Sequence, residues 1–173
     1  MTPTRRPLSE ANCPVARAVD VLADKWTLLI LKNANLGMTR FDQFRADLEI
    51  ADNILSARLG RLVELGLMVR LPYENLGRTR HEYRLTEAGT DVLPILRSFA
   101  EWGHEHTTIN GAPAVPITFI HHTCGNRLEN GQYCPSCDVE VAREDQAWVR
   151  PWRNPVVTKL SEPVEATAPP VSY

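Results

Sequence analysis

Residues 51–71, ADNILSARLGRLVELGLMVRL, change from a helical to a strand pattern at Gly66. Before Gly66, apolar residues recur every three or four positions, which predicts an amphipathic helix that Asp52 caps. After Gly66, apolar residues occupy alternate positions, which predicts a strand. The alternation returns over residues 82–85, so we expect a hairpin whose long tip spans residues 72–80. A helix followed directly by a hairpin is the unit around which the other elements are arranged.

Other helices are predicted on both sides of this unit. The helix after Asp24 ends at Gly37 in the manner of a glycine C-cap, and residues 39–42 have the form of a capping box for a short helix. Pro94 falls in the early turns of the last helix, where it can introduce a kink. The residues expected to begin these helices are Cys13 with Pro14, Asp24, Thr39 and Thr86.

The order of these elements predicts a mainly α-helical fold with a small β-hairpin wing. Two helices joined by a short turn, with the second followed by a basic-tipped hairpin, form a winged helix-turn-helix, which is a DNA-reading arrangement. Over roughly residues 13–108 the sequence also resembles the HxlR-type transcriptional regulators. The motifs that carry this resemblance are, in order, Cys13-Pro14-Val15, Asp24-Lys25-Trp26-Thr27-Leu28-Leu29-Ile30-Leu31, Asn53-Ile54-Leu55-Ser56-Ala57-Arg58-Leu59, Leu65-Gly66-Leu67, Glu82-Tyr83-Arg84-Leu85-Thr86-Glu87-Ala88-Gly89 and Trp102.

The resemblance implies a homodimer that binds a short and imperfectly palindromic operator, and we expect it to be a repressor or a dual regulator. It implies that the first and last helices build the dimer interface and that the helix after Asp52 enters the major groove. The expected DNA-facing residues are Thr39, Arg40, Asn53, Ser56, Arg58 and Arg61, with Arg78 and Arg80 on the wing. The resemblance also leaves room for a small-molecule or electrophile inducer.

The distribution of charge agrees with a local DNA-binding surface. The whole chain has 19 Lys and Arg against 21 Asp and Glu, a net charge of -2, which argues against a protein that coats nucleic acid along its length. Between residues 56 and 85, however, arginines outnumber glutamates. Arginine suits bidentate contacts to phosphate or guanine, and we expect Arg61, Arg78 and Arg80 to be uncompensated. For Arg58 an intramolecular ion pair competes with a DNA contact, and Asp52 would repel phosphate.

The apolar stripes of the first and last helices exceed what one small domain can cover. Exposed stripes of this kind indicate a second copy of the chain, although packing of the two helices within one subunit is the competing interpretation. The residues concerned are Val15, Val19 and Leu22 on the first helix and Leu93, Leu96, Phe99 and Trp102 on the last.

A cluster of metal-binding residue types lies near the C-terminus. His121 and Cys124 form a His-x-x-Cys motif, and Cys134 and Cys137 form a Cys-x-x-Cys motif. Four nitrogen and sulfur ligands in two tight turns are typical of tetrahedral Zn²⁺. A thiol redox centre and cysteines that serve only as small buried residues are the alternatives, and no βαβ setting supports the redox alternative. We expect a small β-rich module that holds about one zinc per chain.

Cys13 is separate from this cluster and lies at the predicted start of the first helix. A thiolate there would be stabilised by the positive end of the helix and by Arg17, Arg5 and Arg6. Several HxlR-type regulators that respond to oxidants or electrophiles have a cysteine at the matching position, so the resemblance implies a redox-sensing role. The competing interpretation is an unreactive, half-buried residue at a helix start.

The domain organisation follows from these assignments. We expect a flexible arm over residues 1–12, a DNA-binding and dimerisation domain over 13–110, a Cys/His module over 111–156 and a disordered tail over 157–173. The longest apolar run, residues 28–31, is far too short for a membrane helix, so a cytoplasmic protein is expected. Because no catalytic motif is found, the sequence predicts no enzyme. A zinc-dependent or thiol-redox protein-interaction module that binds no operator tightly is the alternative function.

Overall fold

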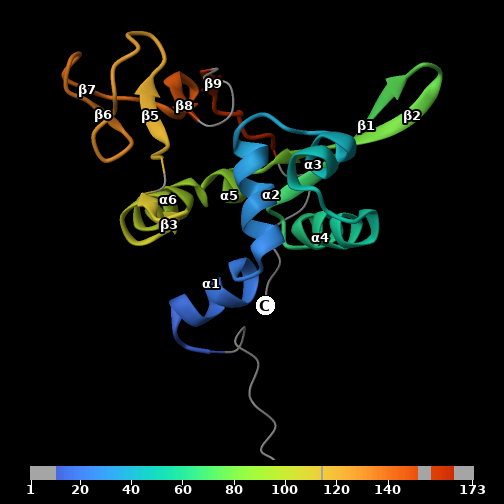
Figure 1. Ribbon diagram of the computed structural model, residues 1–173. Coiled ribbons are helices and arrows are strands. Elements are labelled where there is room, and N and C mark those ends of the chain that lie inside the picture. Colours follow the sequence, from blue (N-terminus) through green and yellow to red (C-terminus); the bar gives the residue numbers. More distant parts are fainter. Residues whose placement is uncertain (1–10, 114, 152–156, 166–173) are drawn as a thin grey trace, which may run out of the picture.

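The computed structural model of the chain describes residues 11–113, 115–151 and 157–165. Its N-terminal part is helical with one long hairpin, and its C-terminal part consists of short strands (Figure 1). The elements of the N-terminal part are α1 (Pro14–Leu22), α2 (Lys25–Asn35), α3 (Phe41–Leu48), α4 (Asp52–Glu64), β1 (Met68–Asn75), β2 (Arg78–Leu85), α5 (Glu87–Thr90) and α6 (Leu93–His106). This is the predicted winged helix-turn-helix, with α4 directly before the β1–β2 wing.

The wing is longer and its turn tighter than the sequence predicts. The strands pair in antiparallel register from Met68 with Leu85 to Asn75 with Arg78, so Leu76 and Gly77 alone make the turn. Both turn residues have positive φ, 51° and 71°, as a two-residue hairpin turn of type I′ requires. The predicted long tip over residues 72–80 is therefore wrong. A leucine in place of the usual asparagine conceals the turn in the sequence.

The helix caps confirm some predictions and correct others. The Asp24 carboxylate accepts hydrogen bonds from the backbone N–H groups of Trp26 and Thr27, so it caps α2 as predicted. For α4, however, the N-cap is Ala51 and Asp52 is the first helical residue. The predicted cap at Thr39 is also displaced, because the N-cap of α3 is Arg40, whose N–H donates to the Gln43 side chain. Several neighbouring residues near a helix start can serve as the N-cap, so the local sequence alone does not determine which of them does.

The last predicted helix is divided in two. Thr86 accepts a hydrogen bond from the Gly89 N–H and caps the short helix α5, not the long helix α6. Pro94 lies in the first turn of α6, where backbone N–H groups have no partner within the helix, so the N–H that proline lacks is not needed there. The proline therefore starts a new helix and does not kink a continuous one.

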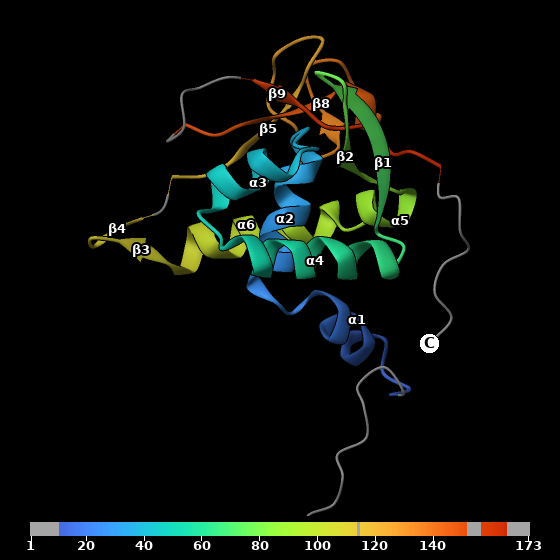
Figure 2. The same ribbon diagram turned by 90° about the vertical axis from the view of Figure 1, so that its right-hand side faces the viewer.

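One apolar core joins the helices to the hairpin. Inward-facing leucines of α4 meet α2 and α3, as the helical spacing predicts, and the base of the hairpin closes the core (Figure 2). The most deeply buried apolar side chains of this part are Ile30, Leu31, Phe44, Leu55, Leu59, Leu62, Met68 and Leu85. Burial of each such side chain contributes about 1.5–3 kcal/mol, so this core fixes the orientation of α4 relative to the wing.

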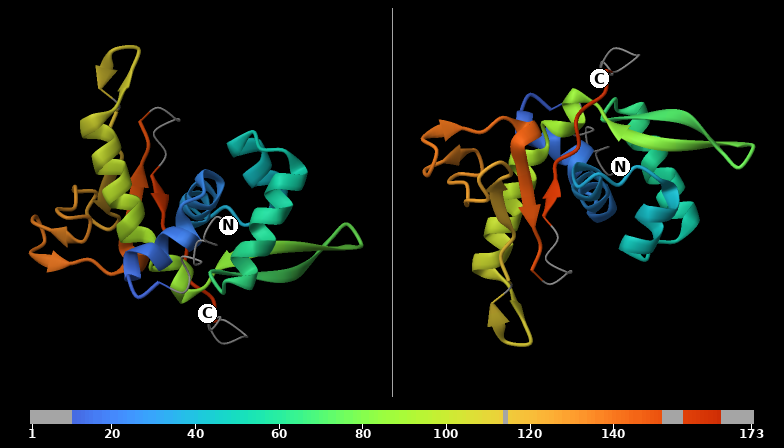
Figure 3. Two further views of the ribbon diagram at one scale, coloured as in Figure 1. Left: turned by 90° about the horizontal axis from the view of Figure 1, so that it is seen from below. Right: turned by 90° about the horizontal axis from the view of Figure 1, so that it is seen from above.

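The C-terminal part packs on α6 and shares this core. Its elements are β3 (Thr108–Ile109), β4 (Ala112–Pro113), β5 (Thr118–His121), β6 (Tyr133–Cys134), β7 (Val139–Glu140), the 3-10 helix η2 (Arg143–Asp145), β8 (Gln146–Val149) and β9 (Thr158–Lys159). Strands β5, β8 and β9 form one sheet, and β6 pairs with β7. Both the wing and the small β3–β4 hairpin project from the body of the molecule (Figure 3). Phe119 and Trp148 meet edge to face in the shared core, with ring centroids 5.0 Å apart.

Residues 157–165 are ordered, which corrects the prediction of a disordered tail beginning at residue 157. Strand β9 extends the β8 edge, and Leu160 is buried. The segment then returns to the N-terminal part, where the Ser161 N–H donates to the Asn35 carbonyl and the Val164 N–H donates to the Leu85 carbonyl. An open strand edge and one apolar side chain thus order a segment whose proline and glutamate content indicates disorder. Residues 1–10 and 166–173, which include most of the predicted arm and the rest of the tail, lie outside the described residues.

Candidate nucleic-acid interface and cysteine cluster

The outward face of α4 is small and polar. Asn53, Ser56 and Arg61 are exposed on the side of the helix opposite its buried leucines. Gly60 lies on the same exposed surface, and a Cβ built on it would meet nothing within 4 Å. A flat helix surface of this kind can approach base edges closely. The structure therefore exposes these three residues of α4, as the sequence predicts.

The Arg58 side chain joins α4 to the start of α2. Its Nε lies 2.9 Å from Asp24 Oδ1, and its Nη2 donates to Asp24 Oδ2 at 3.1 Å. Partial burial raises the pKa of Asp24, but the Thr27 N–H bond and the Arg58 charge outweigh it and hold this pKa below its usual range. Of the two roles left open for Arg58, the ion pair is present.

The arginines predicted to be uncompensated differ from one another. Arg61 Nη1 lies 3.4 Å from Glu64 Oε2 one turn along α4, so the prediction for Arg61 is wrong, although an exposed pair of this kind contributes little. Arg78 and Arg80 are exposed on β2, and within the described part of the chain neither forms an ion pair. Free positive charge is therefore concentrated on the wing.

Thr39 and Arg40 connect the start of α3 to the wing. The Thr39 hydroxyl donates to Glu82 Oε2 at 3.3 Å, and its carbonyl accepts from the Tyr83 N–H at 2.7 Å. The Arg40 guanidinium lies over the Tyr73 ring, 4.9 Å from its centroid, and Tyr73 is the cross-strand neighbour of Arg80. Tyr73 was not expected from the sequence, because nothing in the spacing links α3 to β1.

Asp52 is neutralised within its own motif. Its carboxylate lies 3.4 Å from Arg45 Nη1 on α3, and both side chains are more than half exposed. This pair joins the two helices of the helix-turn-helix at the surface and offsets the repulsion of phosphate expected from Asp52.

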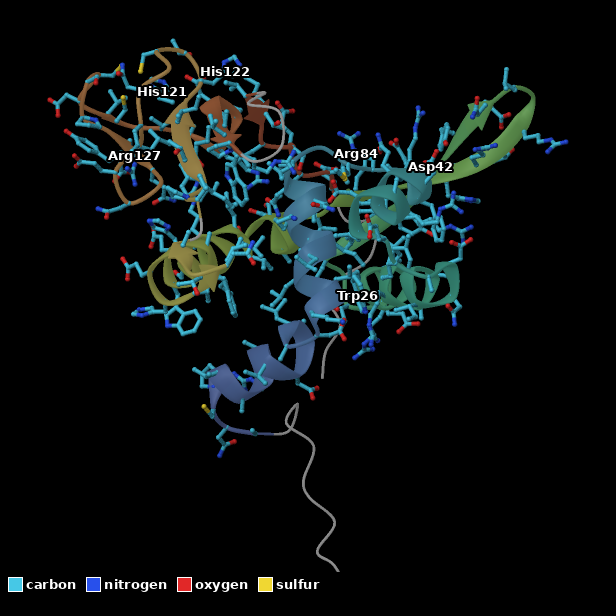
Figure 4. All side chains as sticks on the ribbon, in the orientation of Figure 1. Trp26, Asp42, Arg84, His121, His122 and Arg127 are labelled. Atoms are coloured by element: carbon cyan, nitrogen blue, oxygen red, sulfur yellow. The ribbon has the colours of Figure 1, made fainter. Side chains whose placement is uncertain are left out.

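The C-terminal Cys/His residues form one cluster at the end of the molecule away from α4 (Figure 4). The ligand atoms of His121, Cys124, Cys134 and Cys137 all lie within 4.8 Å of one another. The Cys124 and Cys134 sulfurs are 3.6 Å apart, and His121 Nδ1 is 3.2 Å from Cys124 Sγ. A tetrahedral zinc with Zn–S bonds of about 2.3 Å spaces its sulfur ligands by about 3.8 Å. The donor set and its spacing therefore fit this metal.

The surroundings of the cluster are also those of a metal site. His121 Nε2 lies 2.8 Å from Asp145 Oδ2, which also accepts from the Thr123 hydroxyl at 2.6 Å. Metal-bound histidines characteristically donate their second ring N–H to a carboxylate in this way. Asp145 was missed in the sequence because the fold alone brings it to His121. His122 is exposed and is not part of this cluster, and its Nδ1 lies 3.9 Å from Asp145 Oδ1.

The thiols of the cluster differ in acidity. Backbone and side-chain hydrogen bonds from Asn126 lower the pKa of Cys124 to about 6. A side-chain hydrogen bond between Cys137 and Cys124 raises the pKa of Cys137 to about 11. Cys137 is exposed, which argues against the interpretation of these cysteines as buried space-fillers.

Cys13 is the N-cap residue of α1, directly before Pro14, as predicted. Its thiol is free and exposed, so the half-buried alternative is wrong. Its exposure meets one requirement for reaction with an oxidant.

The apolar stripes are divided between the core and the surface. Leu93 and Leu96 of α6 are buried, whereas Phe99 and Trp102 on the next turns are 57% and 60% exposed. No residue of α1 is buried, and Val15 is 69% exposed. Helix α1 projects from the rest of the chain in Figures 1 and 2, and only its last residues, Val21 and Leu22, pack against the core. The intramolecular interpretation accounts for the two leucines, while the aromatic residues and α1 present an uncovered apolar surface.

Within the described residues, no helix combines the length and the apolar character needed to cross a bilayer.

Comparison with known proteins identifies similar chains. The model of the HxlR-like helix-turn-helix family matches residues 21–110. MT3179 of Mycobacterium tuberculosis (strain CDC 1551 / Oshkosh), an uncharacterized HTH-type transcriptional regulator, is 42% identical over 127 residues, which cover 73% of this chain and 78% of that protein. The crystal structure of PA1607, a proposed transcription factor, has a TM-score of 0.62 at 36% identity and covers 79% of this chain and 94% of its own. The redox regulator HypR in its reduced form has a TM-score of 0.50 at 31% identity, and the match covers 54% of this chain and 92% of the HypR chain.

Proposed function

Because this chain belongs to the HxlR-like helix-turn-helix family of transcriptional regulators, we propose that it is a homodimeric repressor of a short palindromic operator. The observation that carries this proposal is the exposed polar face of α4 beside a wing whose Arg78 and Arg80 have no acidic partner among the described residues. A protein-interaction module would have no reason to keep these charges free. Arg61 gives weaker support because it forms an ion pair with Glu64.

The residues divide into roles according to their surroundings. Asn53 and Ser56 face base edges, where their short polar side chains read sequence, and Arg61 lies one turn further along α4. Arg40, Arg78 and Arg80 contact the phosphate backbone, with Tyr73 supporting Arg40. Thr39 ties α3 to the wing through Glu82, and Arg58 positions α4 through Asp24.

The dimer forms through the uncovered apolar surface of α1 and α6. Val15, Val19, Phe99 and Trp102 are all at least 45% exposed, and large apolar side chains exposed in this way indicate a partner. A second copy of the chain is the partner that matches a palindromic operator, because a two-fold axis places two α4 helices in successive major grooves.

Zinc is the proposed cofactor, held by His121, Cys124, Cys134 and Cys137. When bound, it supplies a structural cross-link between the end of β5 and the β6–β7 turn. Asp145 orients the His121 ring from the opposite side. The Asn126 N–H donors stabilise the Cys124 thiolate, which is the form of cysteine that binds metal.

Cys13 is the proposed redox sensor. Its thiol is exposed at the start of α1, and α1 belongs to the proposed dimer surface. The similarity to HypR, a redox regulator, supports this assignment. Oxidation or alkylation of Cys13 would change how the two copies of α1 pack and so change the spacing of the two α4 helices.

Selection of bound fragments from the genome of the host tests the function as a whole. The purified full chain is expected to enrich a small set of fragments that share an imperfect palindrome. No enrichment above random DNA would favour the protein-interaction module instead.

A further inference from the structure

A cavity of about 440 Å³ lies where the start of α6 meets the C-terminal part of the chain. Its size is within the range of sites that hold small molecules. It is separate from the α4–wing surface and from the cysteine cluster. The polar residues on its wall are Thr90, Asp91, Arg97, Gln132, Arg143 and Gln146.

Arg97 brings a buried positive charge to this cavity. The residue is only 6% exposed, and its Nη2 donates to the Gln146 side-chain oxygen. Its Nε is buried without any hydrogen-bond partner. The guanidinium carbon lies 5.0 Å from the centroid of the Phe119 ring. Both contacting groups are neutral, and Glu101 attracts the guanidinium only from beyond ion-pair distance, so among the described residues no bonded carboxylate balances the charge of Arg97.

Arg143 places a second guanidinium on the same wall. Its Nε donates to the Ser161 carbonyl at 2.9 Å, and its Nη2 donates to Asn35 Oδ1 at 2.6 Å, so its partners are also neutral. Burial, followed by the charge of Arg143, lowers the pKa of Arg97 to about 10, and both groups remain cationic at neutral pH. Asp91, the one carboxylate on the wall among the described residues, attracts Arg143 but lies beyond ion-pair distance.

Arg97 is buried and Arg143 is half-buried, and two neighbouring cations of this kind without a bonded counter-ion are costly for a fold to maintain. Guanidinium groups are also the side chains best suited to bind carboxylate and phosphate, through paired N–H donors. We propose that this cavity binds a small anion bearing a carboxylate or phosphate group, held between Arg97 and Arg143. Gly131 leaves room for the Arg97 side chain, since a Cβ at Gly131 would lie 2.8 Å from it.

The site is connected to the DNA-binding domain through Arg143. The same guanidinium that faces the cavity bonds Asn35 at the end of α2, and Ser161 bonds the carbonyls of Ala34 and Asn35. An anion that binds to Arg143 would therefore compete for the guanidinium that holds Asn35, and so affect the end of α2. This consequence rests on the proposed function, whereas anion binding itself does not.

The test measures thermal unfolding of the full chain without DNA, at constant ionic strength, in chloride buffer and with 1–10 mM inorganic phosphate or succinate. A ligand that binds only the folded state is expected to raise Tm by about 5 °C near saturation. Low millimolar anion excludes the general stabilisation that concentrated phosphate gives. Comparing phosphate with succinate distinguishes a phosphate ligand from a carboxylate ligand.

Two variants locate the effect. Arg97→Met is expected to lose the anion-induced rise in Tm and to be at least as stable as the wild type in chloride. Arg127→Met, which changes an exposed arginine outside this cavity, should keep the response. An unchanged wild-type Tm in both anions, or an equal rise in Arg97→Met, would overturn the proposal. Calorimetric titration of the wild type with the same anions decides the matter even if Arg97→Met does not fold.

Discussion

Arg58 and Asp24 form a two-point ion pair between α4 and the N-cap of α2, with Nε 2.9 Å from Oδ1 and Nη2 3.1 Å from Oδ2. Asp24 uses the same carboxylate to cap α2. One acidic residue thus orients two helices of the DNA-binding motif, which explains why an arginine on α4 is not free for DNA.

A double-mutant cycle measures this relationship. Arg58→Met and Asp24→Asn are expected to be coupled by about 0.5–1 kcal/mol in the free energy of unfolding, a small value because both side chains are over a third exposed. Asparagine keeps the cap, so the cycle isolates the charge. Additive single effects would show that the pair is not maintained in solution.

Acid should weaken the same pair in the wild type. Since the pKa of Asp24 is lower in the folded chain than in the unfolded chain, the stability it contributes is complete above the unfolded pKa and is lost as the pH falls through the folded pKa. Urea unfolding at pH 2–6 should show a smaller acid loss for Asp24→Asn than for the wild type. Parallel profiles would contradict the assigned direction.

The wing should supply affinity without selectivity. Replacing Arg78 and Arg80 with Ala should weaken binding to operator and random duplexes together and lower the salt slope by about one for each phosphate that is no longer neutralised. Fluorescence anisotropy between 50 and 200 mM salt measures both quantities. A loss of affinity confined to the operator would place these arginines at base edges instead.

The α4 face should supply selectivity. Asn53→Ala or Ser56→Ala is expected to cost about 1–3 kcal/mol on the operator and little on random DNA. Glu140→Gln, on β7 in the C-terminal part, is the matched control and should change neither. If the α4 variants weakened binding to both duplexes equally, their assignment to base edges would be wrong.

Purified protein should contain about one zinc per chain. Cys134→Ser should release the metal, and Asp145→Asn should weaken its affinity by about 10- to 100-fold because the His121 ring loses the negative charge of its carboxylate partner. Cys13→Ser, outside the cluster, should retain it. Elemental analysis measures the content, and a folded, metal-free wild type would rule out zinc as the cofactor.

Oxidant should act through Cys13. After peroxide treatment the wild type is expected to lose operator affinity by at least about fivefold, while Cys13→Ser retains it. Treating the protein before and after metal removal separates Cys13 from the cysteine cluster. The sensor assignment fails if the wild type and Cys13→Ser respond alike.

The sequence predicts those features that depend on local spacing. The boundary at Gly66, the cap at Asp24, the inward leucines of α4 and the four-residue cysteine cluster all follow from residues close together in the chain. The Leu76–Gly77 turn was missed because leucine rarely adopts positive φ.

Features that depend on long-range packing were not predictable in this way. Asp145 reaches His121 because β8 pairs with β5, and Leu160 is ordered because β9 joins the same sheet. The neutral partners of Arg97 and Arg143 lie on other elements, so no local pattern marks their cavity.

Affinity for DNA of the correct sequence is the most direct test of a regulator that reads an operator with α4 and the wing. The measurement is the dissociation constant of the reduced wild type for the selected palindrome and for a scrambled duplex of equal length, at 150 mM salt. Binding to the palindrome is expected to be at least about 1,000-fold tighter than binding to the scrambled duplex. Equal affinity for the two duplexes would contradict it.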